Sequence, residues 1–170
     1  DAIYEGNEGA TVAISSVSGG GATESGSQSV SITITDDESA PTVSLAASSS
    51  SISESSASTI TLTATLSQIA DESVTVSFST SGAATSGTDY TTLSNITIAA
   101  GDTTGTASFS TIDDAIYEGD EVATVAISTV SGGGATENGS QSVSITMTDN
   151  ESAPTVALSA SSSSISESSS

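Results

Sequence analysis

Residues 113–152 read DDAIYEGDEVATVAISTVSGGGATENGSQSVSITMTDNES, and this stretch decides the fold. It contains two runs in which apolar residues fall at alternate positions, with Val125 and Ile127 in the first run and Ile145 and Met147 in the second. A period of two is typical of strands that have one buried face. The Gly-rich segment SGGGATENG between the runs predicts a flexible loop that joins two antiparallel strands.

The same stretch occurs earlier in the chain. Residues 1–57 align with residues 114–170 at an offset of 113, and nine of the 57 aligned positions differ. A period of this length is that of a small domain, not of a solenoid unit. With a boundary near the motif ESAPTV, the sequence predicts a complete repeat at 40–152, the C-terminal part of a preceding repeat at 1–39, and the N-terminal strand region of a following repeat at 153–170.

The rest of the predicted complete repeat has the same strand-like alternation. Including the two runs above, strands are predicted at 42–47 with a continuation past a kink into 51–53, and at 58–67, 74–80, 95–99, 104–112, 121–130 and 140–148. About seven short strands with a single apolar face each predict an all-β fold, an immunoglobulin-like antiparallel β-sandwich.

The composition excludes several classes of function. The 170 residues include 21 Asp and Glu but no Lys, Arg, His or Cys. Without basic residues the chain lacks a phosphate-binding surface, so we expect no nucleic-acid partner. Without His or Cys there is no Ser–His or Cys–His nucleophile, no zinc site and no disulfide. Asp113 and Asp114 could form the carboxylate pair of a glycosidase, but with 3% aromatic residues no sugar-binding platform is indicated, and we predict that the protein is not an enzyme.

Acidic residues gather at one end of the predicted sandwich. Successive connections in an antiparallel sandwich alternate between its two ends, which places the connections after 51–53, 74–80 and 104–112 beside the exit of 140–148. Nine of the 13 acidic residues of 40–152 fall at this end. They are Glu54, Asp89, Asp113, Asp114, Glu118, Asp120, Glu121, Asp149 and Glu151.

This clustering needs a physical explanation. Two unit charges 5 Å apart repel by roughly 3 kcal/mol at an effective dielectric constant of 20, and no basic side chain offsets the repulsion here. Acidic residues are also favoured in turns, which is an alternative explanation for isolated carboxylates. The density at one end favours a Ca²⁺ site built from several loops, because Ca²⁺ takes six to eight oxygen ligands in a flexible geometry. Tyr90 and Tyr117, which flank the acidic motifs, are expected to pack in the core or to anchor loops.

Four motifs resemble the Calx-β domain over residues 40–152. In chain order, they are SISES, ATSGTDY, STIDDAIYEGDE and SITMTDNE. Domains of this family are immunoglobulin-like sandwiches that occur in sodium–calcium exchangers and in tandem arrays of large bacterial surface proteins and adhesins, and the calcium-sensing members bind several Ca²⁺ ions at these motifs. The resemblance implies a set of metal ligands that includes the backbone carbonyl of Ile116, and Asn150 at a position where an acid is common. The set is Glu54, Asp89, Asp113, Asp114, Ile116, Glu118, Glu121, Asp149, Asn150 and Glu151.

From these features we expect a calcium-binding structural repeat of a long extracellular fibre, stalk or adhesin on a cell surface, of bacterial origin. Its partners would be neighbouring copies of the same repeat, with lateral self-association into filaments as an option, and no apolar run approaches the ~20 residues of a membrane span. Alternatives are a Ca²⁺-sensing regulatory module, a module that binds a ligand through its loops, and an acidic spacer without metal.

Overall fold

Alternation of β-branched or apolar residues with small polar residues produces a chain of strands in the computed structural model, which describes residues 2–167. These residues form no helix, and therefore none that is long and apolar enough to cross a membrane. The strands are β1 (Glu8–Ala13), β2 (Ser29–Ile34), β3 (Thr42–Ala47), β4 (Ser51–Ser53), β5 (Ile60–Leu66), β6 (Val74–Gly82), β7 (Ile96–Ile98), β8 (Thr104–Phe109), β9 (Glu121–Ser131), β10 (Thr136–Glu137) and β11 (Ser142–Thr148).

Strands β3 to β11 form two packed sheets. The first has the order β10-β3-β5-β8, and the second has the order β4-β11-β9-β6-β7. The chain changes sheet between β3 and β4, at the kink that the sequence predicted, and β4 runs parallel to β11. The immunoglobulin-like β-sandwich is confirmed, and the predicted strand ends differ from the observed ones by at most three residues.

The core lies between the two sheets. In β5, Ile60, Leu62, Ala64 and Leu66 are buried while their neighbours are not, as the alternation predicted. The rings of Tyr90 and Phe109 stack in this core with their centroids 4.8 Å apart. Because Tyr90 directly follows Asp89, burial of its ring fixes the acidic loop between β6 and β7 against the sandwich.

The Gly-rich segment between β9 and β11 differs from the flexible loop that was predicted. Its residues Thr136 and Glu137 form β10, which pairs parallel to β3. The amide of Thr136 donates to the carbonyl of Pro41 at 3.1 Å, and the amide of Asn138 donates to the carbonyl of Val43 at 2.9 Å. The prediction was wrong because β3 is an edge strand, and its unpaired backbone groups provide partners for a segment that has no strand pattern of its own.

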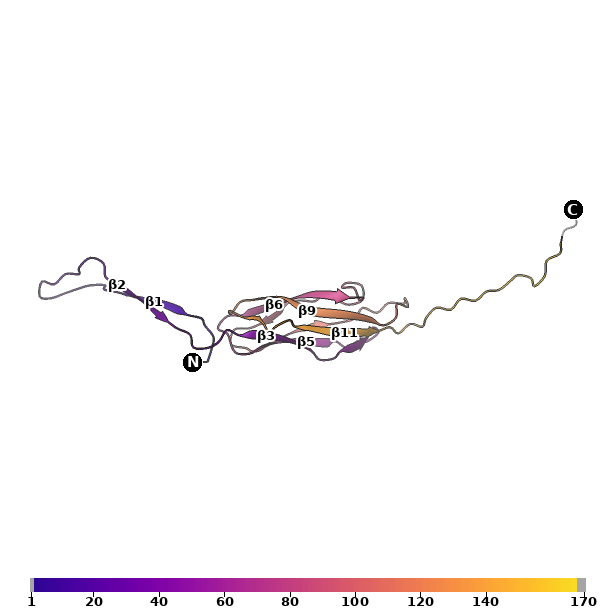
Figure 1. Ribbon diagram of the computed structural model, residues 1–170, viewed down its shortest axis with the longest axis horizontal. Coiled ribbons are helices and arrows are strands. Elements are labelled where there is room, and N and C mark those ends of the chain that lie inside the picture. The colour runs from indigo at the N-terminus through magenta and orange to yellow at the C-terminus, as the bar shows by residue number, and fades with distance from the viewer. Residues whose placement is uncertain (1, 168–170) are drawn as a thin grey trace.

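Strands β1 and β2 form a separate two-stranded sheet at one end of the sandwich, and residues 149–167 leave from the other end as an extended tail (Figure 1). Both segments expose side chains whose equivalents, 113 positions away, are buried. Val156 and Leu158 in the tail are 98% and 101% exposed, whereas Val43 and Leu45 are 0% and 8% exposed. The same residues are therefore buried only where partner strands surround them.

Candidate metal centre

The acidic residues predicted to share one end of the sandwich lie together in the structure. We call this region the acidic end cap, and define it as Glu54, Asp89, the acidic residues between 113 and 121, and residues 149–151. Two groups of three carboxylates occur in it, and in each group one oxygen atom from every residue lies within 4.8 Å of the others. The first group is Asp89, Glu118 and Glu121, and the second is Glu54, Asp149 and Glu151.

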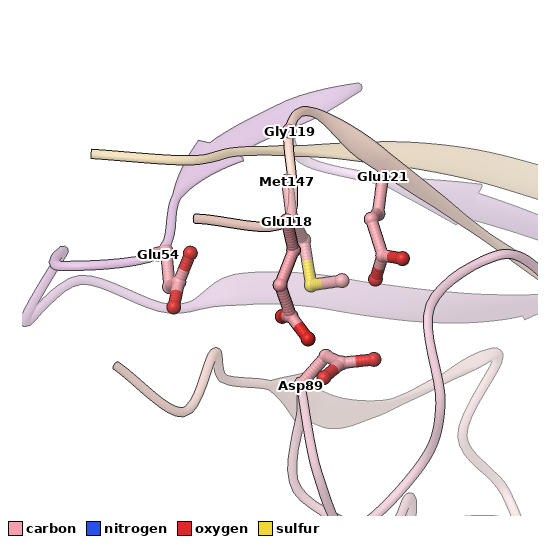
Figure 2. Close-up of a pocket in the computed structure, with 6 residues that line it drawn as sticks. All are labelled: Glu54, Asp89, Glu118, Gly119, Glu121 and Met147. Atoms are coloured by element: carbon pink, nitrogen blue, oxygen red, sulfur yellow. The ribbon is translucent and has the colours of Figure 1, made fainter. Parts of the chain in front are cut away.

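The first group surrounds a small cavity of about 10 Å³ that Glu54, Gly119 and Met147 also line. Figure 2 shows the carboxylates of Asp89, Glu118 and Glu121 turned toward one another, with Met147 behind them. A cavity of this size holds about one water-sized particle. Three carboxylates around a space for one small particle form a donor set that suits a hard cation such as Ca²⁺.

Asp149 organises the loop that precedes β9. Its Oδ2 accepts hydrogen bonds from the amides of Glu118, at 2.7 Å, and Gly119, and its Oδ1 accepts one from the amide of Glu151 at 2.8 Å. These backbone hydrogen bonds, led by the one from Glu151, lower the pKa of Asp149 because they favour its charged form. The carboxylate therefore ties the exit of β11 to the loop that carries Glu118.

The same arrangement recurs around Asp36, which lies 113 positions before Asp149. Asp36 Oδ2 accepts from the amides of Glu5, at 2.8 Å, and Gly6, and its Oδ1 accepts from the amide of Glu38 at 3.0 Å. This copy lacks most of its own sandwich, so these hydrogen bonds form without the sheets that surround Asp149. A third group of three carboxylates, Asp36, Asp37 and Glu38, lies here.

Glu54 joins the acidic end cap from the end of β4, the edge strand that lies beside β11. Its amide donates to the carbonyl of Thr148 at 3.0 Å, which continues the pairing of β4 with β11. Its Oε1 accepts from the amide of Asp114 at 3.2 Å, and its own carbonyl accepts from the hydroxyl of Thr111 at 2.9 Å. Strand pairing thus positions this carboxylate beside Asp149.

Partial desolvation and, after it, repulsion from neighbouring carboxylates raise the pKa of three glutamates in the acidic end cap. Partial desolvation is the largest cause for Glu118 and Glu121, and the nearby charge of Asp89 adds to the rise in both pKa values. Partial desolvation also raises the pKa of Glu151, helped by its contact with Asp149. Because the chain contains no basic side chain, only a proton or an external cation can relieve this repulsion.

Four of the ten predicted ligands lie outside the two groups of three carboxylates. Asp114 Oδ1 accepts from the amide of Ile116 at 2.7 Å, and Ile116 itself is 62% exposed. Asn150 donates through Nδ2 to Glu151 Oε1 at 2.9 Å. Asp113 is close enough to raise the pKa of Glu151 by repulsion. These residues surround the two groups, and their role as ligands stays a prediction.

One carboxylate oxygen of the second group has no hydrogen-bond partner among the described residues. This atom is Glu151 Oε2, and it is buried. A buried carboxylate oxygen without a partner is costly unless an ion or a water binds it. This atom, the converging carboxylates and the absence of basic residues all fit a bound divalent cation.

Gly119 and Met147 are not expected here from the sequence, and Asp120 is predicted at this end of the sandwich but not among the ligands. Gly119 supplies an amide to Asp149, Met147 lines the cavity, and Asp120 accepts from the amide of Asp149 at 3.2 Å. The repeat contained a signal for the last of these, since the equivalent of Asp120 is Asn7, whose Oδ1 makes the same contact with the amide of Asp36. Both residues offer a side-chain oxygen.

In metal-free protein we expect the free energy of unfolding to increase as the pH falls from 7. The pKa values of Glu118, Glu121 and Glu151 are raised above 4.5 in the folded chain, so their protonation favours the folded state, and this gain is complete below pH 4.5. The pKa of Asp149 is lowered from 3.8, so its contribution is lost only as the pH falls below 3.8. Urea unfolding in chelator should therefore give maximal stability between about pH 3.8 and 4.5. A stability that decreases steadily from pH 7 to 4 would contradict this expectation.

Comparison with known proteins identifies the family. A family model for the Calx-beta domain matches residues 36–152, which is more than half of the chain. Among curated proteins, no sequence matches. The crystal structure of the apo-form Calx CBD1 domain aligns with a TM-score of 0.51 and 16% identity, over 64% of this chain and 98% of that chain. The crystal structure of CBD12 from CALX1.2 aligns with a TM-score of 0.50 and 17% identity, over 59% of this chain and 41% of that chain. The two structural alignments agree in fold with the sandwich described above, and the chain belongs to the Calx-beta domain family.

Proposed function

We propose that the chain is a calcium-binding structural repeat of a long extracellular fibre, stalk or adhesin, in which Ca²⁺ stiffens the joints between repeats. The observation that carries this proposal is the acidic end cap, where two groups of three carboxylates converge without a basic residue in the chain. Membership of the Calx-beta family, which includes calcium-binding domains of sodium–calcium exchangers, supports the choice of ion.

Six residues would hold the metal directly. They are Asp89, Glu118 and Glu121 in one group and Glu54, Asp149 and Glu151 in the other. Bound Ca²⁺ supplies positive charge that offsets carboxylate repulsion, and water or the surrounding Asp113, Asp114, Asn150 and the carbonyl of Ile116 would complete its oxygen ligands. The loops that these residues occupy would then be held together with the exit of β11.

The arrangement along the chain supports a structural role. We propose a complete repeat at 40–152 between parts of a preceding repeat at 1–39 and a following repeat at 153–170. Only Asn150 to Ala153 separate Asp149 from Pro154, so a following repeat would begin beside the acidic end cap. A metal that orders this end would therefore also restrict the angle between neighbouring repeats. The net charge of −21 would keep such arrays soluble and apart until divalent ions bridge them.

A Ca²⁺-sensing regulatory module is the second candidate, because the family includes domains of ion exchangers. The near-identity of the two copies favours the structural role, since a sensor needs few and differentiated domains. The loops at the opposite end of the sandwich carry few aromatic residues and no Arg, which gives little support to a ligand-binding module.

The proposal is tested by X-ray scattering from a two-repeat chain, in which residues 153–170 are extended to a full second copy of the 113-residue repeat. With Ca²⁺ we expect a single extended shape with a larger maximum dimension, and with chelator a distribution of bent shapes. Calorimetric titration with Ca²⁺ on the same sample measures binding. Binding without any change in scattering would leave a calcium-binding domain but contradict the stiffened joint, and absence of binding would contradict the whole proposal.

A further inference from the structure

Tyr4 of the preceding segment attaches to the far end of the sandwich, opposite the acidic end cap. The amide of Tyr4 donates to the carbonyl of Ile69 at 3.1 Å, and the carbonyl of Tyr4 accepts from the amide of Asp71 at 3.2 Å. Together they form a parallel bridge between Tyr4 and Ala70 in the loop between β5 and β6. In Figure 1 the N-terminal segment lies at the end of the sandwich opposite the C-terminal tail.

The ring of Tyr4 lies against Gly134, in the turn between β9 and β10. A Cβ atom placed on Gly134 would lie 2.4 Å from Tyr4 Cε1 and 3.1 Å from its Cζ. Gly134 also has a φ of +60°, a conformation that side chains other than glycine rarely adopt. Only glycine therefore allows both this turn and this close approach of the ring.

Tyr117 is the equivalent of Tyr4, 113 positions later, and its loop has the same hydrogen bonds. Amides of Glu118 and Gly119 donate to Asp149, as those of Glu5 and Gly6 donate to Asp36. The tyrosine hydroxyl lies in the same place in both loops, 3.9 Å and 4.0 Å from a Cβ built on the respective glycine.

The surroundings of the two copies differ. Tyr117 is 46% exposed and therefore does not pack in the core, one of the two positions predicted for it, and the neighbouring Ile116 is 62% exposed. Gly21, the equivalent of Gly134, has a similar φ of +68°, but nothing approaches within 4 Å of a Cβ built on it. Tyr4 thus contacts the turn at Gly134, whereas Tyr117 and the turn at Gly21 lack this contact.

We propose that Tyr117 is the docking residue for a following copy of the repeat, with its ring on that copy's equivalent of Gly134 and its backbone on the equivalents of Ile69 and Asp71. The docking partner must be a complete copy, because the contact needs both the glycine turn and the loop equivalent to Ile69–Asp71. A partial copy such as residues 1–39 contains the glycine turn but lacks that loop. This inference rests on the tandem arrangement of the proposed function, but it does not require Ca²⁺. Its link to the acidic end cap is the loop that carries both Tyr117 and Glu118.

The existing contact is tested in the 170-residue chain. The absence of Cys allows two spin labels to be placed cleanly, at Ser29→Cys on β2 and Thr65→Cys on β5, both exposed. We expect one narrow distance distribution, its loss in Tyr4→Ala, and its retention in Tyr4→Phe, which keeps the ring. Tyr117→Ala is the matched control and should change nothing. Equal effects of Tyr4→Ala and Tyr117→Ala would overturn the inference.

The glycine turn has its own control. Gly134→Ala should also lose the narrow distance, whereas Gly139→Ala introduces alanine at a similar φ of +65° with nothing within 4 Å. If both variants lose the narrow distance, backbone strain explains the loss and the ring contact does not. That outcome would count against the docking of Tyr4, and therefore against that of Tyr117.

The proposed contact is tested in the two-repeat chain, with labels at Ser142→Cys and at the second copy's equivalent of Thr65. We expect Tyr117→Ala to lose the narrow distance while calorimetry shows Ca²⁺ binding unchanged. If the narrow distance survives Tyr117→Ala while Ca²⁺ still binds, the docking inference fails and the calcium proposal stands. If Ca²⁺ does not bind and Tyr117→Ala still loses the distance, the calcium proposal fails and the docking inference stands.

Discussion

In excess Ca²⁺ the chain is expected to unfold at a temperature about 10 °C higher than in chelator. A ligand present at 100 times its dissociation constant stabilises the folded state by about 2.7 kcal/mol for each site. For a domain of this size, about 1 kcal/mol shifts the melting temperature by roughly 4 °C. A single occupied site is enough for the expected shift, and the two groups of carboxylates in the acidic end cap provide positions for more.

Differential scanning calorimetry in Ca²⁺, in Mg²⁺ and in added NaCl checks this result. Mg²⁺ should give a smaller shift, because it demands near-octahedral geometry and loses its water reluctantly. NaCl reports general screening of the charge of −21. Equal shifts with all three salts would show an acidic surface without a specific site. The calcium shift should also shrink in mild acid, since the ligands must be deprotonated to bind metal.

Asp149→Asn is expected to lower the affinity for Ca²⁺ by at least about tenfold, the range typical of residues that orient metal ligands. Asp149 belongs to one group of carboxylates, and it also holds the amides of Glu118 and Gly119 that position the other group. An asparagine keeps one oxygen acceptor, but its NH₂ would face an amide donor in place of the second oxygen. The single substitution therefore removes a charge and releases the loop before β9.

Calorimetric titration of Asp149→Asn with Ca²⁺ measures the effect, and Asp102→Asn is the matched control. Asp102 is exposed in the turn between β7 and β8, and it belongs to none of the carboxylate groups among the described residues. The control should bind Ca²⁺ as the unmodified chain does. Unchanged affinity in Asp149→Asn would mean that the acidic end cap is not the calcium site. An equal loss of affinity in both variants would mean that the change in net charge explains the effect.

Much of the fold could be predicted because its signals are local. The alternation at Ile60, Leu62, Ala64 and Leu66 marks one face of a strand whatever its neighbours are. The alternation of connections between the two ends of a sandwich predicts from the sequence alone that nine carboxylates lie together. The alternation depends only on the number of strands and their antiparallel order. It could not divide the carboxylates into groups, since that depends on how each loop bends.

Other features depended on partners that are distant in the sequence. Strand β10 forms because the edge of β3 is unpaired, and nothing in SGGGATENG itself indicates a strand. The meeting of Tyr4 with Gly134 joins residues 130 positions apart, and no pattern around either residue predicts it. Such contacts are decided by which backbone groups remain unsatisfied when the sheets are complete.

The two copies within the chain distinguish what the local sequence determines from what contacts with distant residues determine. The loop around Asp36 repeats the hydrogen bonds of the loop around Asp149 although most of its own sandwich is missing, so the sequence of the hairpin and its flanking loops determines these hydrogen bonds. Burial behaves differently, because Val43 is enclosed while its equivalent Val156 is exposed. Hydrogen bonds within a hairpin and its flanking loops need only that segment, whereas apolar burial needs a second sheet. Tertiary structure therefore decided which residues form the core and which carboxylates face one another.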